Sequence, residues 1–210
     1  MLSRILRRPL WLCLAALCAL GMASAYAVHH PTLAPTEPSV DIRHLPPLAI
    51  GDWVLRMGTS TDSRVVQQLS SGAYSHIGMV VAVEPRVMVI HATTDDHPEL
   101  ANQVLLSTLE EFFQPGLASR IAIARPTFLQ TPQKLAIARA LLAEQGKPFV
   151  LEPRDTAHRY CTTLLADAIR AEHPAFDPPW QHIDVAFFRG EYLFPQAFVD
   201  YPGVEWVYRR

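Results

Sequence analysis

The sequence predicts an α+β fold, with a mostly antiparallel sheet and helices packed on it. Short runs rich in β-branched residues occupy the first half of the domain, and two segments with helical periodicity follow them. One more run of this strand type closes the chain. Strands grouped in this way around two main helices are typical of α+β domains.

Each of the expected strands is short. Gly51 and Asp52 form a turn before the first strand. The second and third strands are separated only by residues around Glu84-Pro85-Arg86, which predicts a hairpin. The predicted strands cover residues 53–56, 77–83, 87–91, 121–124, 149–151 and 205–209.

Two helices are indicated in the second half of the chain. The first has Thr131 as its N-cap and Pro132 at the first helical position, and Gly146 and Pro148 follow its end. Its expected apolar stripe is Leu135, Ala138, Leu141 and Leu142. The second helix begins at Cys161 and shows the i, i+3, i+4, i+7, i+8 spacing of an amphipathic helix. The residues at this spacing are Cys161, Leu164, Leu165, Ala168 and Ile169.

Residues 1–25 have the pattern of a secretory signal peptide. Arg4, Arg7 and Arg8 form a basic start, and an apolar run over 10–22 is too short to span a bilayer comfortably. Residues 23–25 supply the small side chains of a cleavage site. We therefore expect a bacterial protein that is periplasmic or secreted, and that meets the membrane only if this segment stays uncleaved.

Residues 26–48 contain five prolines and no clear periodicity, so they are predicted to be a leader or linker. Residues 49–210 then form one domain of ordinary size. Without the signal segment, which holds three arginines and no acidic residue, the formal charge falls from −2 to −5. An acidic chain disfavours a nucleic-acid partner. The sequence does not indicate an oligomeric state.

Cys161 is the only cysteine outside the signal segment, because Cys13 and Cys18 lie within it. An exported chain with one thiol has no intramolecular disulfide partner. Cys161 is then either a buried packing residue or a reactive thiol. Its place at a helix start suits the second role, because the free amides and the helix dipole stabilise a thiolate and lower its pKa. The same amides suit an oxyanion.

A reactive thiol needs a base, and His76 and His91 are the candidates. His76 begins the first strand of the predicted hairpin and His91 ends the second. If the loop is Glu84-Pro85, Gly78 lies opposite His91, and the two histidines are diagonal neighbours about 7–8 Å apart on one face. A loop with an odd number of residues would instead place them on opposite faces.

A metal site is the rival use of these residues. His91, Asp95, Asp96, His97 and Glu99 are potential ligands within nine positions, but a solvated acidic loop explains the last four equally well. The sequence contains neither an H-E-x-x-H motif nor a C-x-x-C pair. It also lacks the G-x-S-x-G elbow of many serine hydrolases. We therefore expect no metal and no cofactor.

Four short segments, in this order, resemble a known family. They are G-D-W-V-L-R at 51–56, Y-S-H-I-G-M-V at 74–80, V-I-H-A at 89–92 and Y-C-T-T-L-L at 160–165. The series resembles the circularly permuted branch of the NlpC-type papain-like cysteine hydrolases, the YiiX-like group related to lecithin–retinol acyltransferase. The resemblance covers residues 47–173. It implies a permuted papain-like fold with its nucleophile at a helix N-terminus and its histidine earlier in the chain.

The resemblance also implies roles for individual residues. Cys161 would be the nucleophile, His76 the general base and His91 the third member that orients the base. YiiX-like members often have an acidic residue at this third position, whereas the acyltransferase branch tends towards histidine, so His91 departs from the closer relatives. Tyr74 and Tyr160 flank the key residues and are expected to line a substrate pocket, although packing at element ends explains them equally well.

The expected function is that of an exported cysteine amidase or peptidase that works through an acyl-enzyme. Its location makes small peptides or peptidoglycan fragments the natural substrates. Three alternatives remain open: a lipid thioesterase or acyltransferase on the same fold, a catalytically inactive binding module, and a metal-dependent hydrolase.

Overall fold

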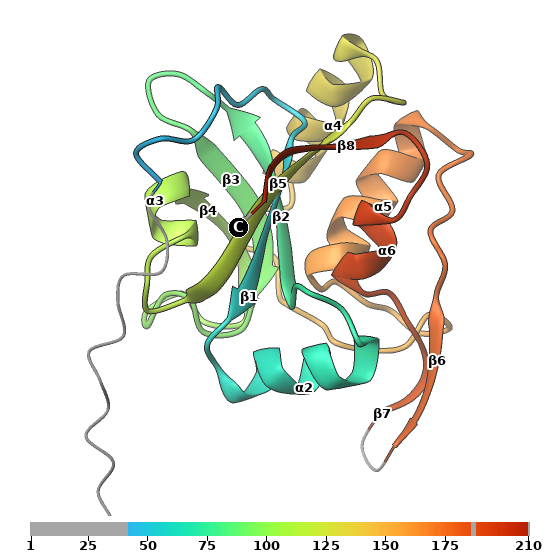
Figure 1. Ribbon diagram of the computed structural model, residues 1–210. Helices are drawn as coiled ribbons and strands as arrows, with labels where there is room; N and C mark the ends of the chain where they lie inside the picture. The colour runs from blue at the N-terminus through green and yellow to red at the C-terminus, as the bar shows by residue number, and fades with distance from the viewer. Residues whose placement is uncertain (1–41, 186–187, 210) are drawn as a thin grey trace, which may run out of the picture. The chain divides into compact units, whose positions relative to one another are not determined.

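A six-stranded antiparallel sheet forms the centre of the fold (Figure 1). In this computed structural model the described residues are 42–185 and 188–209, so the predicted signal peptide and the first part of the predicted linker lie outside them. The strand order is β4-β3-β2-β1-β5-β8. The strands are β1 Trp53–Gly58, β2 His76–Ala82, β3 Met88–Thr93, β4 Gln103–Thr108, β5 Ala118–Pro126 and β8 Val204–Arg209.

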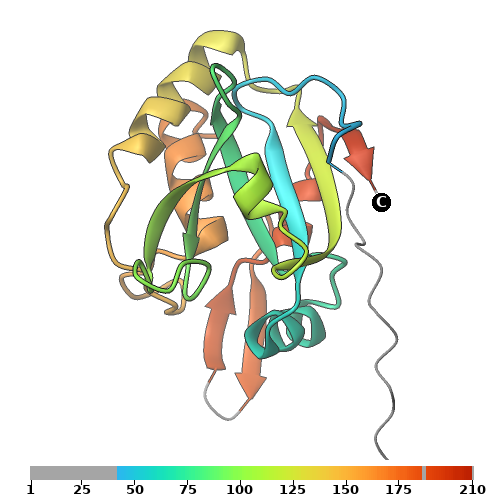
Figure 2. The same cartoon turned by 90° about the vertical axis from the view of Figure 1, so that its left-hand side faces the viewer.

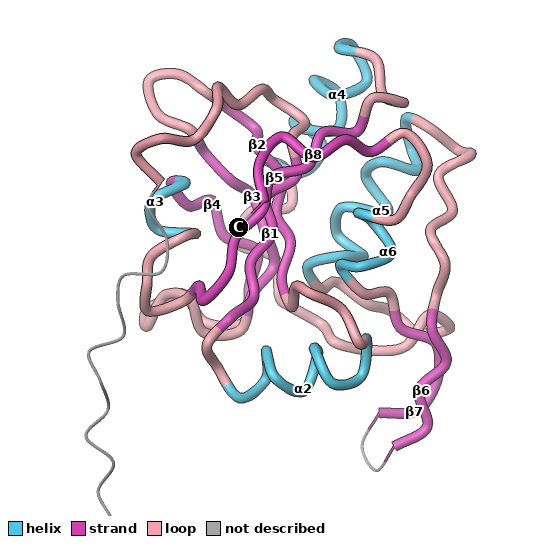
Figure 3. Tube along the Cα trace, in the orientation of Figure 1, coloured by secondary structure: helices cyan, strands magenta, loops and turns pink. Residues whose placement is uncertain are grey.

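Helices lie on both faces of this sheet (Figures 1 and 2). On one face lie α4 (Thr131–Leu142), α5 (Cys161–Glu172) and α6 (Pro195–Val199), and on the other lies the short α3 (Leu109–Phe112). Helix α2 (Thr61–Ser70) lies at one end of the strands, near a small second sheet of β6 (Gln181–Val185) and β7 (Phe188–Tyr192). The segment between α4 and α5 is a loop (Figure 3), except for isolated β-bridges at Pro148 and between Val150 and Arg159.

The sheet separates two hydrophobic cores. In β1, Trp53 and Leu55 face the core under α4 and α5, while Val54 faces the core under α3. Successive side chains of a strand point to opposite faces, so a strand covered on both sides buries every residue. All six residues of β1 are buried. This double burial explains why the central strands are nearly continuous apolar runs in the sequence.

Residues 42–48, which the sequence assigns to a linker, pack on the domain. Ile42, Leu45 and Leu48 lie against the core under α3. The carbonyl of Pro47 accepts a hydrogen bond from Arg125 at 3.4 Å, and the same arginine binds the buried carboxylate of Asp52 at 2.7 Å. The packed part of the chain therefore begins before residue 49.

The hairpin of β2 and β3 has the register that places the two histidines on one face. Met79 pairs with Ile90 and Val80 with Val89, and one further step in this register sets Gly78 opposite His91, although the pairing itself ends at Met79. Nearer the loop the register shifts by one residue, between Val80 and Ala82. Such a bulge lets a loop of different length keep the register at the far end of the strands.

The predicted α+β class and antiparallel sheet are confirmed. Of the six predicted strands, 149–151 is wrong, because Val150 forms only an isolated bridge with Arg159. The sequence reading missed α2, α3, α6, β4 and the β6–β7 pair. Helix α2 has no buried residue, and its apolar side chains line a cavity instead of packing in the core. None of the helices within the described residues is long and apolar enough to cross a bilayer.

The two predicted helices are present, and one of their apolar stripes differs from the expected one. Helix α4 has Gln130 as its N-cap, one residue before the predicted cap. Ala138 and Leu141 are buried as expected, but Leu135 and Leu142 are 39% and 37% exposed, and Ile137 is buried instead. In α5, four of the five residues at the predicted spacing are buried: Cys161, Leu164, Leu165 and Ile169.

Replacing Gly78 with alanine is expected to destabilise the fold. An added Cβ would lie 2.6 Å from Cγ1 of Val89 and 3.1 Å from the carbonyl oxygen of Ile90, so β2 and β3 would have to move. Overpacking of this kind costs about 1–3 kcal/mol, which denaturant unfolding can measure. Gly116→Ala is the matched control, because nothing lies within 4 Å of its added Cβ. Equal stability of the two variants would contradict the close approach at Gly78.

Candidate functional site

Cys161 is the first residue of α5, and the start of this helix is held in place by several hydrogen bonds. The amide of Tyr160 donates to Oγ1 of Thr163 at 3.0 Å, which caps the helix. The amide of Leu193 donates to the Tyr160 hydroxyl at 2.9 Å, and the Thr162 hydroxyl donates to the Leu193 carbonyl at 2.7 Å. The thiol is therefore presented from a rigid helix end.

Burial raises the pKa of the Cys161 thiol to about 11. Backbone hydrogen bonds from Ile77 and Thr162, and the charge of Arg56, act in the opposite direction but are weaker. The expected lowering of this pKa by the helix start is therefore wrong. The helix amides do favour the thiolate, but removing the sulfur from water disfavours it more.

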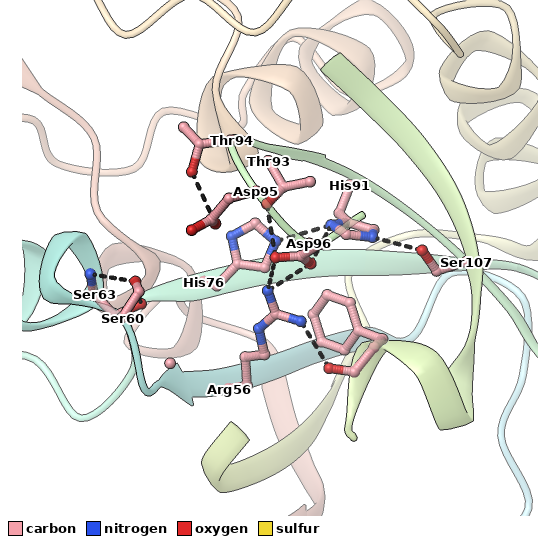
Figure 4. Close-up of polar contacts among 12 residues, drawn as sticks. Arg56, Ser60, Ser63, His76, His91, Thr93, Thr94, Asp95, Asp96 and Ser107 are labelled. Carbon is pink, nitrogen blue, oxygen red and sulfur yellow. Dashed lines mark hydrogen bonds and ion pairs between the residues drawn. The ribbon is translucent and has the colours of Figure 1, made fainter. Parts of the chain in front are cut away.

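His76 and His91 form a hydrogen-bonded pair, as their predicted register requires (Figure 4). Nε2 of His76 lies 2.9 Å from Nδ1 of His91. Nε2 of His91 lies 3.0 Å from the hydroxyl of Ser107 on β4. A Cβ at Gly78 would be 3.2 Å from Cβ of His91, so glycine leaves the space beside the pair open. The predicted adjacency of the two histidines is confirmed.

The thiol and the histidine pair lie on opposite sides of the sheet, and no hydrogen bond joins Cys161 to His76 among the described residues. Cys161 packs in the core under α5, whereas His76 stacks on Phe112 of α3, with ring centroids 5.5 Å apart. The recorded pairing of β2 with β3 begins at Met79, three residues after His76. The backbone of Ile77, the residue that follows His76, acts to lower the pKa of the Cys161 thiol against the larger effect of burial, so the thiol lies on the side of β2 that Ile77 faces.

A buried ion pair lies against the histidines. Nη2 of Arg56 is 2.6 Å from both carboxylate oxygens of Asp96, and Nη1 donates to the carbonyl of Phe112 at 2.8 Å. The guanidinium carbon also lies 4.7 Å from the centroid of the Phe112 ring. Only 5% of the Arg56 side chain and 7% of the Asp96 side chain are exposed. The reading of Asp96 as part of a solvated loop is therefore wrong.

Sequence reasoning missed Arg56, Asp96 and Ser107 as members of this site. Arg56 did leave a signal, because it is the one charged residue in the buried run W-V-L-R-M and a buried charge needs a partner. Asp96 could not be chosen over Asp95 from the sequence alone. Asp95 is exposed, whereas Asp96 also accepts a hydrogen bond from Thr93 at 2.9 Å.

The histidines are neutral and Asp96 is ionised at neutral pH. Burial lowers the pKa of His91 to about 3, although the Asp96 charge opposes this. Burial lowers the pKa of His76 well below its usual value too, and the charge of Arg56 adds to that shift. For Asp96, burial alone would raise the pKa, but the charge of His76 whenever that ring is protonated, and the permanent charge of Arg56, hold it below its ordinary range.

A cavity of about 300 Å³ is lined by Cys161 and His76, and it has a polar and an apolar end. Its size lies at the lower end of the range of small-molecule sites. The polar end includes Arg56, Ser75, Thr93, Thr94, Asp95 and Asp96. The apolar end includes Val65, Val66 and Leu69 of α2, Phe149, and Phe188, Tyr192 and Phe194 near the second sheet.

The structure separates the two tyrosines that were predicted to bind substrate. Tyr160 lines the cavity. Tyr74 is buried elsewhere, with its ring 6.1 Å from that of Trp206 on β8. The cavity wall instead includes Tyr192, which the sequence did not single out.

The potential metal ligands are also redistributed. Ligand atoms of His76, His91 and Asp96 lie within 4.8 Å of one another. His97 and Glu99 are exposed, and the ring of His97 accepts a hydrogen bond from the amide of Glu99 at 3.2 Å. The predicted five-residue ligand group thus reduces to His91 and Asp96, joined by His76.

Fold and site together define an antiparallel α+β domain in which a thiol at a helix start and one histidine of a buried pair line the same cavity. No protein-family model and no curated protein matches the sequence. The fold is similar to the crystal structure of the metalloprotein YiiX from Escherichia coli O157:H7, with a TM-score of 0.63 and 17% sequence identity. The similarity covers 77% of this chain and 97% of the YiiX chain, so the chain has a YiiX-like fold.

Acid is expected to destabilise the fold through the histidine pair. Both pKa values lie below the ordinary 6.5 in the folded state, so the unfolded chain binds protons first as the pH falls. Stability is therefore complete above pH 6.5 and is lost on acidification towards pH 3, where His91 itself titrates. Each histidine contributes up to about 1.4 kcal/mol per pH unit.

Denaturant unfolding at a series of pH values checks this prediction. His91→Gln should reduce the slope of stability against pH in the range below pH 6.5. His182→Gln, which alters an exposed histidine on β6, is the control and should leave the slope as it is. A wild-type protein with no loss of stability in this range would show that the pair is not held neutral by burial.

Proposed function

We propose that this protein is a cysteine hydrolase with Cys161 as nucleophile and His76 as general base, on a permuted papain-like variant of its fold. The observation that carries the proposal is that the Cys161 thiol and His76 line one cavity while Nε2 of His76 is taken by His91. That contact orients the ring and leaves Nδ1 as the basic atom. Both histidines precede the cysteine in the chain, as the permuted order requires.

The chemistry starts from neutral partners. The thiol has a raised pKa and the imidazoles have lowered ones, so the resting site is not a thiolate–imidazolium pair. Proton transfer from Cys161 to His76 then accompanies attack on a bound carbonyl, and the helix N-terminal amides hold the oxyanion. The leaving group takes the proton back from the base, and water releases the acyl-enzyme.

The first candidate substrate is an amide in a small peptide, such as a cell-wall fragment, in keeping with the exported location that the signal pattern predicts. The shape of the cavity favours a second candidate. Val65, Val66 and Leu69 of α2 face a space that Phe188 and Phe194 also line. An apolar chamber beside the nucleophile suits an ester or thioester with an aliphatic acyl group, as a lipid-directed thioesterase or acyltransferase would use.

A metal-dependent hydrolase is the weaker reading, although the similar YiiX protein is a metalloprotein. His76, His91 and Asp96 offer three ligand atoms, but the Arg56 guanidinium contacts both oxygens of Asp96. A divalent cation there would lie beside the positive charge of Arg56 in a buried site. The single carboxylate of Asp96 would then have to compensate the charges of the cation and the guanidinium together. The residues do not fit a resident metal, and no step of the mechanism uses one.

Loss of either the thiol or the base is expected to abolish hydrolysis. With an activated ester as substrate, Cys161→Ala should remove turnover and His76→Ala should lower kcat by about 100-fold or more. The residual rate of His76→Ala should rise with pH towards 11, the thiol pKa, because hydroxide then replaces the base. Exposed His182→Ala is the control. Full activity of Cys161→Ala would exclude the thiol mechanism. If neither the wild type nor the variants hydrolyse the ester, a binding module is favoured.

Acyl-chain length separates the two substrate classes. For an aliphatic acyl group, kcat/KM on p-nitrophenyl esters should rise by up to about fourfold per methylene until the cavity is full. Leu69→Asp should flatten this dependence, because the charge enters the apolar end. Gln67→Asp on the same helix is the matched control, since Gln67 lines a different groove. Cleavage of muropeptides with no preference for chain length would instead support the peptide substrate.

A further inference from the structure

The second histidine has polar partners that the proposed mechanism leaves unused. His91 is fully buried and contacts four other side chains besides its own strand neighbours. They are His76 on β2, Ser107 on β4, Asp96 after β3 and Phe112 of α3, whose ring centroid lies 5.0 Å from that of His91. Nδ1 of His91 lies 3.7 Å from Oδ2 of Asp96. A residue that merely orients a base does not need a carboxylate at that distance.

The hydrogen bonds fix one arrangement of protons once His76 acts as the base. Nδ1 of His76 must then be bare, so its proton is on Nε2 and is donated to Nδ1 of His91. His91 consequently carries its own proton on Nε2 and donates it to the hydroxyl of Ser107. Ser107 thus selects the tautomer of His91 that can accept a proton from His76.

The charges around the pair differ between its two rings. Arg56, His76 and Asp96 are the charged or titratable groups that act on His91, and Ser107 and Phe112 complete its surroundings. For His91 the Asp96 charge is the larger influence after burial, whereas for His76 it is the Arg56 charge. Asp96 acts on both rings, and its Oδ2 lies 3.7 Å from Nδ1 of His91, so a positive charge on His91 faces an anion at close range.

We propose that His91 holds the positive charge that the thiol proton brings, with Ser107 and Asp96 as the positioning residues that make this possible. The S–H bond of Cys161 breaks and an N–H bond forms at Nδ1 of His76. At the same time the Nε2–H bond of His76 breaks and an N–H bond forms at Nδ1 of His91. The electron pair stays on sulfur, His76 remains neutral and His91 becomes the cation.

This inference rests on the proposed function, but its test needs no substrate. The rate of alkylation of Cys161 by iodoacetamide reports how easily the thiol loses its proton, and peptide mass spectrometry assigns the label to Cys161 in the full chain. At neutral pH, Asp96→Asn should lower the rate by about tenfold or more, the effect of removing one opposite charge within 4–6 Å. The matched control is Glu99→Gln, an exposed carboxylate of the same loop that does not line the cavity, and it should leave the rate within about twofold.

A second variant covers the case that Asp96→Asn fails to fold with Arg56 left unpaired. Ser107→Ala removes one hydroxyl and no charge, and Ser107→Thr keeps the hydroxyl. Nitrogen-15 NMR of the histidine rings should show His91 protonated at Nε2 in the wild type. Ser107→Ala should reduce this tautomer and slow alkylation at neutral pH, and Ser107→Thr should restore both. These readouts respond to the tautomer, which a purely structural role of Ser107 would not change.

The outcomes separate the two proposals. Alkylation that does not depend on His76 would overturn the cysteine hydrolase itself. Alkylation that depends on His76 but is unchanged in Asp96→Asn, or a wild-type His91 protonated at Nδ1, would leave the hydrolase standing and overturn the role of His91. A rate that falls in Asp96→Asn and in Ser107→Ala, but not in Glu99→Gln, supports the transfer of charge to His91.

Discussion

The buried ion pair between Arg56 and Asp96 is the interaction on which the rest of the site depends. It joins β1 to the loop after β3, and through the Phe112 carbonyl it also joins α3. Removing one partner of such a pair leaves an uncompensated buried charge and costs about 3–5 kcal/mol. Because Phe112 contacts both histidine rings as well as the guanidinium, the ion pair also holds the imidazoles in place.

Burial explains both the neutral resting state and the need for the second histidine. In a site this buried, a thiolate and an imidazolium are each unfavourable. Burial therefore raises the pKa of Cys161 and lowers the pKa of His91. A base in such a place needs a nearby anion when it becomes charged. Asp96 is that anion, and its distance from His91 connects the ion pair to the proposed chemistry.

The fold places these groups on opposite faces of a covered sheet. Cys161 belongs to the helical side and His76 to the side of α3, and both line one cavity. Helix α2 and the second sheet then close the apolar end of the cavity. Helix α2 and the β6–β7 sheet, which the sequence pattern did not predict, therefore shape the cavity in which any substrate would lie.

The sequence by itself determined the elements whose pattern is local. The helix that begins at Cys161 follows from its apolar spacing. The register that pairs His76 with His91 was predicted only for one length of the loop, which the sequence left open. Only the tertiary structure decided the rest. The direction of the thiol pKa depends on total burial, and the choice of Asp96 over Asp95 depends on where Arg56 lies, 40 residues away. Electrostatic energies depend on distances through space, which a local sequence pattern does not contain.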